Sequence, residues 1–247
     1  MHKPSSDLPS CLIAHRGYAS RFPENTLLAL DSAIQAGARY VEGDVLLSAE
    51  GVPVLFHDRD CHRLCGVSGA IHDYPLAALR ELTAYSPDRF GDRYRGTPIP
   101  TVEELALWLG RHPAVTAFVE IKRQAAERFG PAAVVEATWR ALGPARAHTV
   151  LISFSREVLA AARPLWRQIG VIADHLTELH DAAVRGLHCE IAFCDLAGLP
   201  ADGPFTTPVP LAIYEVPDVD TACRVLTRGA TFIETFAVGE LFAAWQS

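Results

Sequence analysis

Segments typical of β-strands alternate with segments typical of α-helices along most of this 247-residue chain. Strands joined by helical crossovers run parallel to one another, because the crossover returns the chain to the same edge of the sheet. Eight such units close a parallel sheet into a (β/α)8 barrel, and a chain of this length fits one barrel. We therefore expect an α/β fold, a TIM barrel, in a single domain over residues 1–247. The strand-like segments begin at Leu12, Tyr40, Ala117, Thr149, Ile169, Glu190, Pro210 and Thr231.

Three segments depart from this regular alternation. Gly51–His57 reads as an additional extended arm that follows an Ala-Glu-Gly turn. Residues 59–100, rich in Arg, Asp, Gly and Tyr, make a long excursion between the second strand and its helix. Residues 198–208 contain too many prolines for the sixth helix of a barrel.

The helices that we expect cover residues 25–38, 101–109, 132–142, 157–165, 178–187, 218–226 and 238–245.

Composition excludes several classes of partner. The formal net charge is −7 and no Lys/Arg cluster is dense enough for a nucleic-acid interface. No apolar run reaches the roughly 18 residues of a membrane span, and Met1–Ser10 is polar, without the apolar segment of a signal peptide. The six cysteines show no disulfide framework, so we expect reduced thiols and a cytoplasmic protein.

Four short segments at the ends of strand-like runs carry groups that suit a phosphate and a divalent metal. Catalytic groups of α/β barrels stand at the carboxyl ends of strands. Three carboxylates can hold a hard metal ion, two imidazoles can transfer protons, and an arginine and a lysine can bind an anion. Metal-assisted cleavage of a phosphodiester needs this set of groups. The residues are His15, Arg16, Glu42, Asp44, His57, Glu120 and Lys122.

The spacing of the acidic residues predicts that they converge on a metal ion. Side chains two apart on a strand share a face, so Glu42 and Asp44 point together, as do Glu120 and Lys122. Adjacent strands lie about 4.8 Å apart, which brings the three carboxylates into one site. Carboxylates gathered this closely repel one another unless a cation is present. Ligation by oxygen alone points to one divalent cation, Mg2+ or Ca2+, rather than zinc.

Six short motifs follow one another between residues 15 and 122. They are His15-Arg16-Gly17, Pro23-Glu24-Asn25-Thr26, Glu42-x-Asp44, Gly51-Val52-Pro53-Val54 leading to His57-Asp58, Ile99-Pro100-Thr101-Val102-Glu103-Glu104, and Glu120-Ile121-Lys122. Their order resembles that of the glycerophosphodiester phosphodiesterase family, whose core pattern is His-Arg, then Glu-x-Asp, then His-Asp. The resemblance is dense over residues 12–122 and looser afterwards.

The resemblance implies a fold, a reaction and a role for each site residue. It implies a TIM barrel with a small inserted subdomain after the second strand, which fits residues 59–100. It implies hydrolysis of a small-molecule glycerophosphodiester to sn-glycerol 3-phosphate and an alcohol. The attacking oxygen is either water or the glycerol 2-hydroxyl. The implied metal ligands are Glu42, Asp44 and Glu120, the acid/base pair is His15 and His57, and Arg16 and Lys122 lie near the phosphate.

The last two strands depart from the family pattern. Many members carry a Trp-Thr-Val-Asn run at the seventh strand, where this chain reads Ile213-Tyr214-Glu215-Val216. Members often end the eighth strand with Thr-Asp, whereas this chain has Glu234-Thr235-Phe236. We expect Tyr214, Glu215 and Glu234 to form an altered substrate pocket. Its acidic wall suits a cationic head group such as choline or ethanolamine.

The residues leave three functions open, and they predict no oligomeric state. The first is hydrolysis of glycerophosphodiesters, and the second is cleavage of lysophospholipids in the manner of a phospholipase D. The third is a non-catalytic barrel that binds a phosphodiester, although a binding module has no need of the paired imidazoles of His15 and His57.

Some of these residues also have plain structural interpretations. Lys122 can pair with a neighbouring barrel acid, and Asp58 can orient His57. Either Asn25 or Thr26 can cap the helix that follows.

Overall fold

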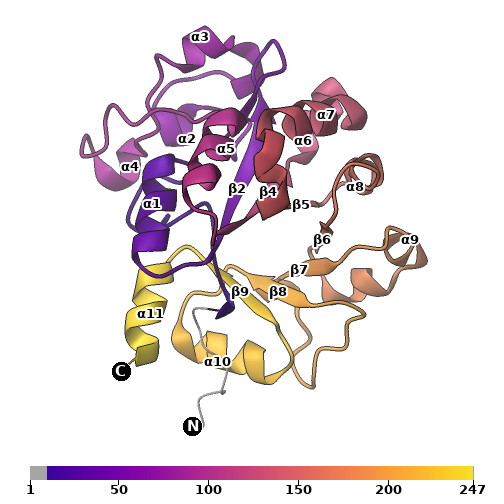
Figure 1. Ribbon diagram of the computed structural model, residues 1–247. Helices are drawn as coiled ribbons and strands as arrows, with labels where there is room; N and C mark the ends of the chain where they lie inside the picture. The colour runs from indigo at the N-terminus through magenta and orange to yellow at the C-terminus, as the bar shows by residue number, and fades with distance from the viewer. Residues whose placement is uncertain (1–9, 247) are drawn as a thin grey trace.

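The structure is a computed structural model that describes residues 10–246. Nine of the ten N-terminal residues that lack the apolar segment of a signal peptide, residues 1–9, therefore lie outside the described residues. Eight parallel strands form a closed barrel: each pairs with the next, and the first pairs with both the second and the last (Figure 1). This confirms the predicted fold class. The strands are β1 (Leu12–Ala14), β2 (Tyr40–Leu47), β4 (Thr116–Ile121), β5 (Thr149–Ser153), β6 (Ile169–Ala173), β7 (Ile191–Asp195), β8 (Leu211–Tyr214) and β9 (Phe232–Thr235).

A ninth strand, β3 (Pro53–Leu55), is the expected extended arm. It pairs antiparallel with the end of β2, and Val45 lies opposite Leu55. Gly51, at φ +86°, makes the turn between the two strands in a backbone conformation that glycine tolerates best. The arm returns the chain to the carboxyl end of β2, where His57 follows.

The helices agree with the predicted positions in most of the chain, with boundaries shifted by a few residues. Thr101 caps α5 and forms the capping box with Glu104 that its sequence predicts. The principal helices are α1 (Leu27–Gln35), α5 (Val102–Arg111), α7 (Pro131–Leu142), α8 (Arg156–Ala162), α10 (Val219–Thr227) and α11 (Val238–Gln246).

One helix prediction was wrong, and one helix was not predicted. The expected helix over 178–187 is instead a 3-10 turn, Leu176–His180, and a short helix, α9 (Ala182–Arg185). Asp181 separates them because its backbone is extended, at φ −60° and ψ 136°. A helix that the sequence argument missed, α6 (Arg123–Phe129), begins directly after Lys122. The absence of a sixth barrel helix is confirmed, because residues 199–210 form neither helix nor strand.

Residues 59–100 fold into short helices grouped at one end of the molecule (Figure 1). They are α2 (His62–Cys65), α3 (Leu76–Leu79), α4 (Pro87–Phe90) and a 3-10 turn, Ile71–Asp73. Leu64, Ile71 and Leu79 are fully buried and belong to the same apolar cluster as the outer face of the barrel. That this segment is an inserted subdomain, and that residues 1–247 form one domain, stay predictions.

The core has two layers, because alternate residues of each strand face the barrel axis or the helices. The inner layer includes Ile13, Phe118, Ile152 and Phe193, and the rings of Phe118 and Phe193 meet edge to face at 5.2 Å. The larger outer layer joins strands and helices. All six cysteines are free thiols, as expected. Among residues 10–246 there is no helix with both the length and the apolar character needed to cross a membrane.

Candidate active site

The predicted site residues gather at the carboxyl ends of the strands, around a cavity of about 140 Å³. β1 supplies His15 and Arg16, β2 supplies Glu42, and the segment that follows β3 supplies His57. Glu120 and Lys122 come from the end of β4. The first four of the other lining residues are apolar, and the last three lie in or directly after the last two strands, β8 and β9. These residues are Ile152, Phe154, Ile172, Phe193, Tyr214, Glu215 and Glu234.

Three buried carboxylates converge, as the sequence predicts. Oxygens of Glu42, Asp44 and Glu120 lie within 4.8 Å of one another. In the register of the sheet, Asp44 lies opposite Glu120. The side chains are at most 9 % exposed, and Glu42 Oε1 has no hydrogen-bond partner. Because the donors are all oxygens and one of them lacks a partner, this group fits a hard divalent cation such as Mg2+ or Ca2+.

Asp44 is the most strongly held of the three. Its carboxylate accepts a hydrogen bond from Asn25 Nδ2 at 2.8 Å and lies 3.1 Å from Arg16 Nε and 3.3 Å from Lys122 Nζ. Burial alone would raise the pKa of Asp44, but Arg16 and Lys122 outweigh it and hold that pKa well below its usual range. Asp44 therefore stays ionised.

Asn25 is a site residue that the sequence argument missed. Its Oδ1 also accepts the backbone N–H of Asp44 at 2.9 Å, and it lies at φ +57°, which Asn tolerates better than most residues. The helix cap is Thr26, whose hydroxyl accepts the N–H of Ala29. The motif Pro23-Glu24-Asn25-Thr26 thus starts a helix and also holds a site carboxylate.

Lys122 pairs with two barrel acids, which is the structural interpretation of this residue. Its Nζ lies 3.0 Å from Glu120 Oε1 in addition to its contact with Asp44. Burial raises the pKa of Glu120 to about 7, although Lys122 opposes the increase. Burial alone would lower the pKa of Lys122, but the two acids outweigh it and raise that pKa above its usual range. The role of Lys122 at a phosphate stays a prediction.

His15 lies between an aromatic ring and a carboxylate. It stacks on Phe236, with ring centroids 4.2 Å apart and planes 12° apart, and its Nε2 is 3.9 Å from Glu42 Oε2. Burial, with a contribution from Arg16, lowers the pKa of His15 well below 6.5, so the imidazole is neutral at pH 7. Burial and repulsion from Asp44 raise the pKa of Glu42 well above its usual value.

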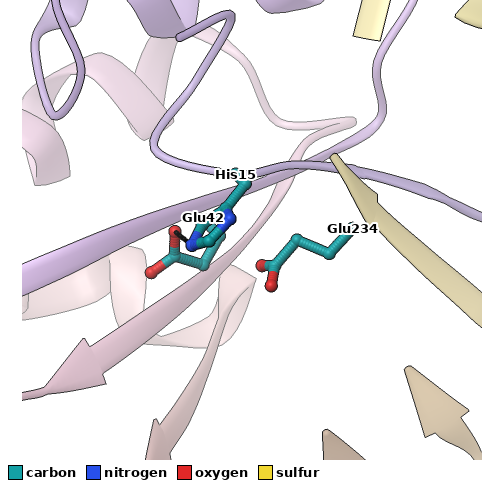
Figure 2. Close-up of side chains that lie close together, drawn as sticks. All are labelled: His15, Glu42 and Glu234. Atoms are coloured by element: carbon teal, nitrogen blue, oxygen red, sulfur yellow. Dashed lines mark ion pairs between the residues drawn. The ribbon is translucent and has the colours of Figure 1, made fainter. Parts of the chain in front are cut away.

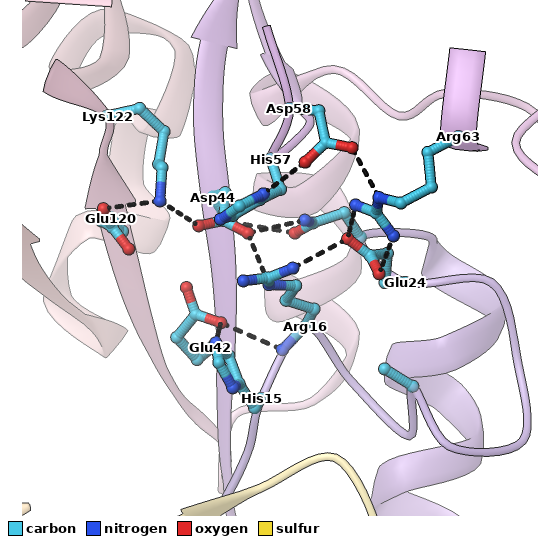
Figure 3. Close-up of polar contacts among 12 residues, drawn as sticks. His15, Arg16, Glu24, Glu42, Asp44, His57, Asp58, Arg63, Glu120 and Lys122 are labelled. Carbon is cyan, nitrogen blue, oxygen red and sulfur yellow. Dashed lines mark hydrogen bonds and ion pairs between the residues drawn. The ribbon is translucent and has the colours of Figure 1, made fainter. Parts of the chain in front are cut away.

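A chain of ion pairs leads outward from the second imidazole (Figure 3). His57 Nδ1 lies 2.7 Å from Asp58 Oδ1, and Asp58 Oδ2 accepts from Arg63 Nε. Arg63 then binds both oxygens of Glu24 at 2.7 Å, and Glu24 also accepts from Arg16. The orienting role expected for Asp58 is therefore geometrically possible. Arg63 was missed by the sequence argument, because it stands in no motif.

The three residues of the predicted altered pocket all line the cavity. The hydroxyl of Tyr214 donates to the Ala173 carbonyl at 3.5 Å, and Glu215 adopts φ +61°. Glu234 is only 3 % exposed and points toward His15 and Glu42 (Figure 2). Burial and repulsion from Glu120 and Asp44 raise the pKa of Glu234 well above its usual value.

Comparison with known families gives a match over about half of the chain. The model of the glycerophosphoryl diester phosphodiesterase family matches residues 15–139. That range contains every predicted metal, acid/base and phosphate residue, and it excludes Tyr214, Glu215 and Glu234.

Curated relatives match a similar part of the chain. Glycerophosphodiester phosphodiesterase 1 of Mus musculus is 36% identical over 113 residues, which are 46% of this chain and 34% of that protein. A glycerophosphodiester phosphodiesterase of Caldanaerobacter subterraneus is 34% identical over 103 residues, 42% of each chain. The matched residues thus span well under two thirds of the length of these relatives.

Solved structures match over nearly the whole chain. A glycerophosphodiester phosphodiesterase from Agrobacterium tumefaciens is 25% identical with a TM-score of 0.75, covering 95% of this chain and 99% of that one. A phosphodiesterase from Oleispira antarctica, solved with its product sn-glycerol-3-phosphate, is 24% identical with a TM-score of 0.81 and covers 96% and 97%. The second likeness supports the barrel fold alone.

Proposed function

The chain belongs to the glycerophosphoryl diester phosphodiesterase family, and from this premise we propose that it hydrolyses glycerophosphodiesters to sn-glycerol 3-phosphate and an alcohol. One observation carries the proposal. A single small cavity is lined by two histidines, by Arg16 and Lys122, and by Glu42 and Glu120 of the three-carboxylate group. Phosphodiester hydrolysis needs neutralisation of the phosphate charge and two proton transfers, and groups suited to each of these tasks line this one cavity.

His15 and His57 are the proposed acid/base pair. His15 is neutral near pH 7, so it can accept a proton from the attacking hydroxyl. Asp58 accepts a hydrogen bond from Nδ1–H of His57, which leaves Nε2 free to exchange a proton with the substrate. The attacking oxygen belongs either to water or to the glycerol 2-hydroxyl.

Arg16 and Lys122 are the proposed phosphate contacts. Both line the cavity while paired with acids, so they are held in place before the substrate arrives. A divalent cation, Mg2+ or Ca2+, bound between Glu42, Asp44 and Glu120 would neutralise phosphodiester charge as a Lewis acid. The pairing of Asp44 with both basic residues keeps that ligand ionised.

The cavity suits a small substrate. Its volume of about 140 Å³ is below the roughly 300–1,000 Å³ typical of drug-sized sites, which favours a glycerophosphodiester over a lysophospholipid. Tyr214 and Glu215 line the cavity at the end of β8 and offer an aromatic ring and an acid for a cationic head group. Equal turnover of glycerophosphocholine and glycerophosphoinositol would count against this preference.

Release of sn-glycerol 3-phosphate from glycerophosphocholine tests the proposal. The assay compares Mg2+, Ca2+ and EDTA, for the wild type and for His15→Ala, and uses the exposed His62→Ala as a control. We expect metal-dependent release that His15→Ala reduces by a factor of about 100 or more. Choline release from lysophosphatidylcholine alone would favour the phospholipase D alternative. Metal binding without any turnover would favour a non-catalytic barrel.

A further inference from the structure

Three buried side chains face one another on the side of the cavity nearest β9. His15 comes from the end of β1, Glu42 from β2 and Glu234 from β9 (Figure 2). One nitrogen of the imidazole and one oxygen of each carboxylate all lie within 4.8 Å of one another. Only Glu42 of this set also belongs to the three-carboxylate group.

Each of these side chains has a buried polar atom without a partner. The atoms are His15 Nδ1, Glu42 Oε1 and Glu234 Oε1. The residues are 7 %, 2 % and 3 % exposed, so bulk water does not reach these atoms. A buried polar atom without a hydrogen bond is destabilising, so one such atom on each of three converging side chains indicates a missing ligand.

The charges of the surrounding groups indicate that the missing ligand is a cation. Glu42, Asp44, Glu120 and Glu234 are buried carboxylates, and the basic groups that pair with members of this set are Arg16 and Lys122. A fifth buried carboxylate, Glu24, pairs with Arg63 and with Arg16. Asp44 and Glu120 take both of these basic groups in ion pairs. Among residues 10–246, no Lys or Arg side chain forms an ion pair with Glu234.

The donor atoms distinguish this group from the first one. The three-carboxylate group offers only oxygen, which suits Mg2+ or Ca2+, whereas an imidazole with two carboxylates suits Zn2+. We propose that His15, Glu42 and Glu234 form a second cation site, selective for zinc, which shares Glu42 with the first site.

The site can close around zinc with small movements. Ligand atoms at about 2.1 Å from a tetrahedral zinc are about 3.4 Å apart, so separations of up to 4.8 Å require shifts of about 1 Å. The two glutamates have flexible side chains, and stacking on Phe236 fixes the plane of the imidazole. Glu42 has a second oxygen, Oε2, which accepts the Arg16 backbone N–H at 3.0 Å and orients the carboxylate.

Zinc in this site would inhibit the enzyme. A zinc-bound imidazole cannot accept a proton, so His15 would be lost to acid/base chemistry while the first site still holds its own cation. This consequence rests on the proposed function, but the binding of zinc itself does not.

Zinc binding measured directly tests the proposal. Titration calorimetry with Zn2+ in saturating Mg2+ compares the wild type, Glu234→Gln and, as a control, Glu81→Gln, an exposed glutamate outside the cavity. We expect one zinc ion per wild-type chain, at least tenfold weaker binding by Glu234→Gln, and unchanged binding by Glu81→Gln. Equal affinity of the wild type and Glu234→Gln, or loss of all zinc to competing Mg2+, would overturn the proposal.

Two further measurements keep the test decisive. Glu234→Asp retains the charge on a shorter side chain, so it replaces Glu234→Gln if that variant does not fold, and it should also bind zinc more weakly. Anomalous diffraction at the zinc edge should show a peak between His15, Glu42 and Glu234, and a peak only at the three-carboxylate group would refute the site. Absence of glycerophosphodiesterase activity in zinc-free Mg2+ buffer, with zinc binding intact in the titration, would instead refute the proposed function and leave the zinc site standing.

Discussion

His57 Nδ1 lies 2.7 Å from Asp58 Oδ1, and this contact joins the outer imidazole to a series of ion pairs. The second oxygen of Asp58 accepts from Arg63, which also binds Glu24 with two hydrogen bonds. A histidine that is oriented in this way presents its other ring nitrogen to the cavity in one tautomer. From this geometry we propose that Asp58 positions His57 and is not a ligand of a cation.

Asp58→Asn should lower kcat by a factor of about 10–100 and leave KM nearly unchanged. The amide can donate to Nδ1 and so favours the wrong tautomer of His57, whereas binding of substrate does not depend on that tautomer. Steady-state kinetics on glycerophosphocholine measure the effect, with the exposed Asp88→Asn as control. A rise in KM at constant kcat would contradict the positioning role.

Arg63→Met should destabilise the protein by about 1–2 kcal/mol. Glu24 is only 4 % exposed and would keep Arg16 as its one basic partner. The loss is below that of a fully buried pair because the Arg63 side chain is 42 % exposed. Urea unfolding measures the difference, and Arg140→Met, which removes an exposed pair with Glu136, should cost at most about 0.5 kcal/mol. Equal losses in the two variants would contradict a structural role for Arg63.

The sequence predicts the barrel and the acidic group because both depend on local spacing. Glu42 and Asp44 share a face because they are two residues apart on one strand, and parallel pairing puts Glu120 opposite Asp44. Arg63 could not be predicted, since its partner Glu24 is 39 residues away. The same holds for Phe236 against His15, a contact made only when the barrel closes.

The failed helix prediction over 178–187 has a different cause. The apolar spacing there suits a helix, but the extended backbone of Asp181 divides it into a 3-10 turn and α9. A periodic pattern shows which positions are buried, and it does not show a break at a single residue.

Glu234 was predicted to line the pocket, and its direction toward Glu42 emerges only from the folded barrel (Figure 2).

Gly43→Ala should weaken both the fold and the binding of the divalent cation. An added Cβ would lie 3.3 Å from Asn25 Oδ1 and 3.6 Å from Leu55, so Asn25 must move, and Asn25 holds Asp44. We expect a loss of about 1–2 kcal/mol in unfolding free energy and a several-fold weaker affinity for Mg2+.

Gly110→Ala is the matched control for this substitution. Gly110 lies within α5, and a Cβ there meets no atom within 4 Å. The change should stabilise the protein by about 0.5–1 kcal/mol and leave Mg2+ affinity unaltered. Equal effects of the two substitutions on Mg2+ affinity would contradict the link from Gly43 through Asn25 to Asp44.

Divalent cations should raise the melting temperature more at pH 8 than at pH 5.5. In the cation-free protein the pKa of Glu120 is raised to about 7, so the folded state holds a proton that the unfolded chain releases above about pH 4.5. The stability that this proton contributes is present at low pH and is lost as pH rises toward 7. Burial and repulsion from Asp44 raise the pKa of Glu42 as well, so it acts in the same direction.

A bound cation replaces these protons, because carboxylates must be ionised to coordinate it. Below pH 7 a proton on Glu120 competes with the cation by about 1.4 kcal/mol per pH unit, which gives about 2 kcal/mol less stabilisation at pH 5.5. Thermal unfolding with Mg2+ and with EDTA, at each pH, measures this difference in stabilisation. Protonation of His15 at low pH destabilises the protein equally with and without cation, so its effect drops out when the EDTA melting temperature is subtracted from the Mg2+ melting temperature. Glu120→Gln should abolish the cation's effect at both pH values. A larger cation effect at pH 5.5 than at pH 8 in the wild type would show that Glu120 is not a ligand.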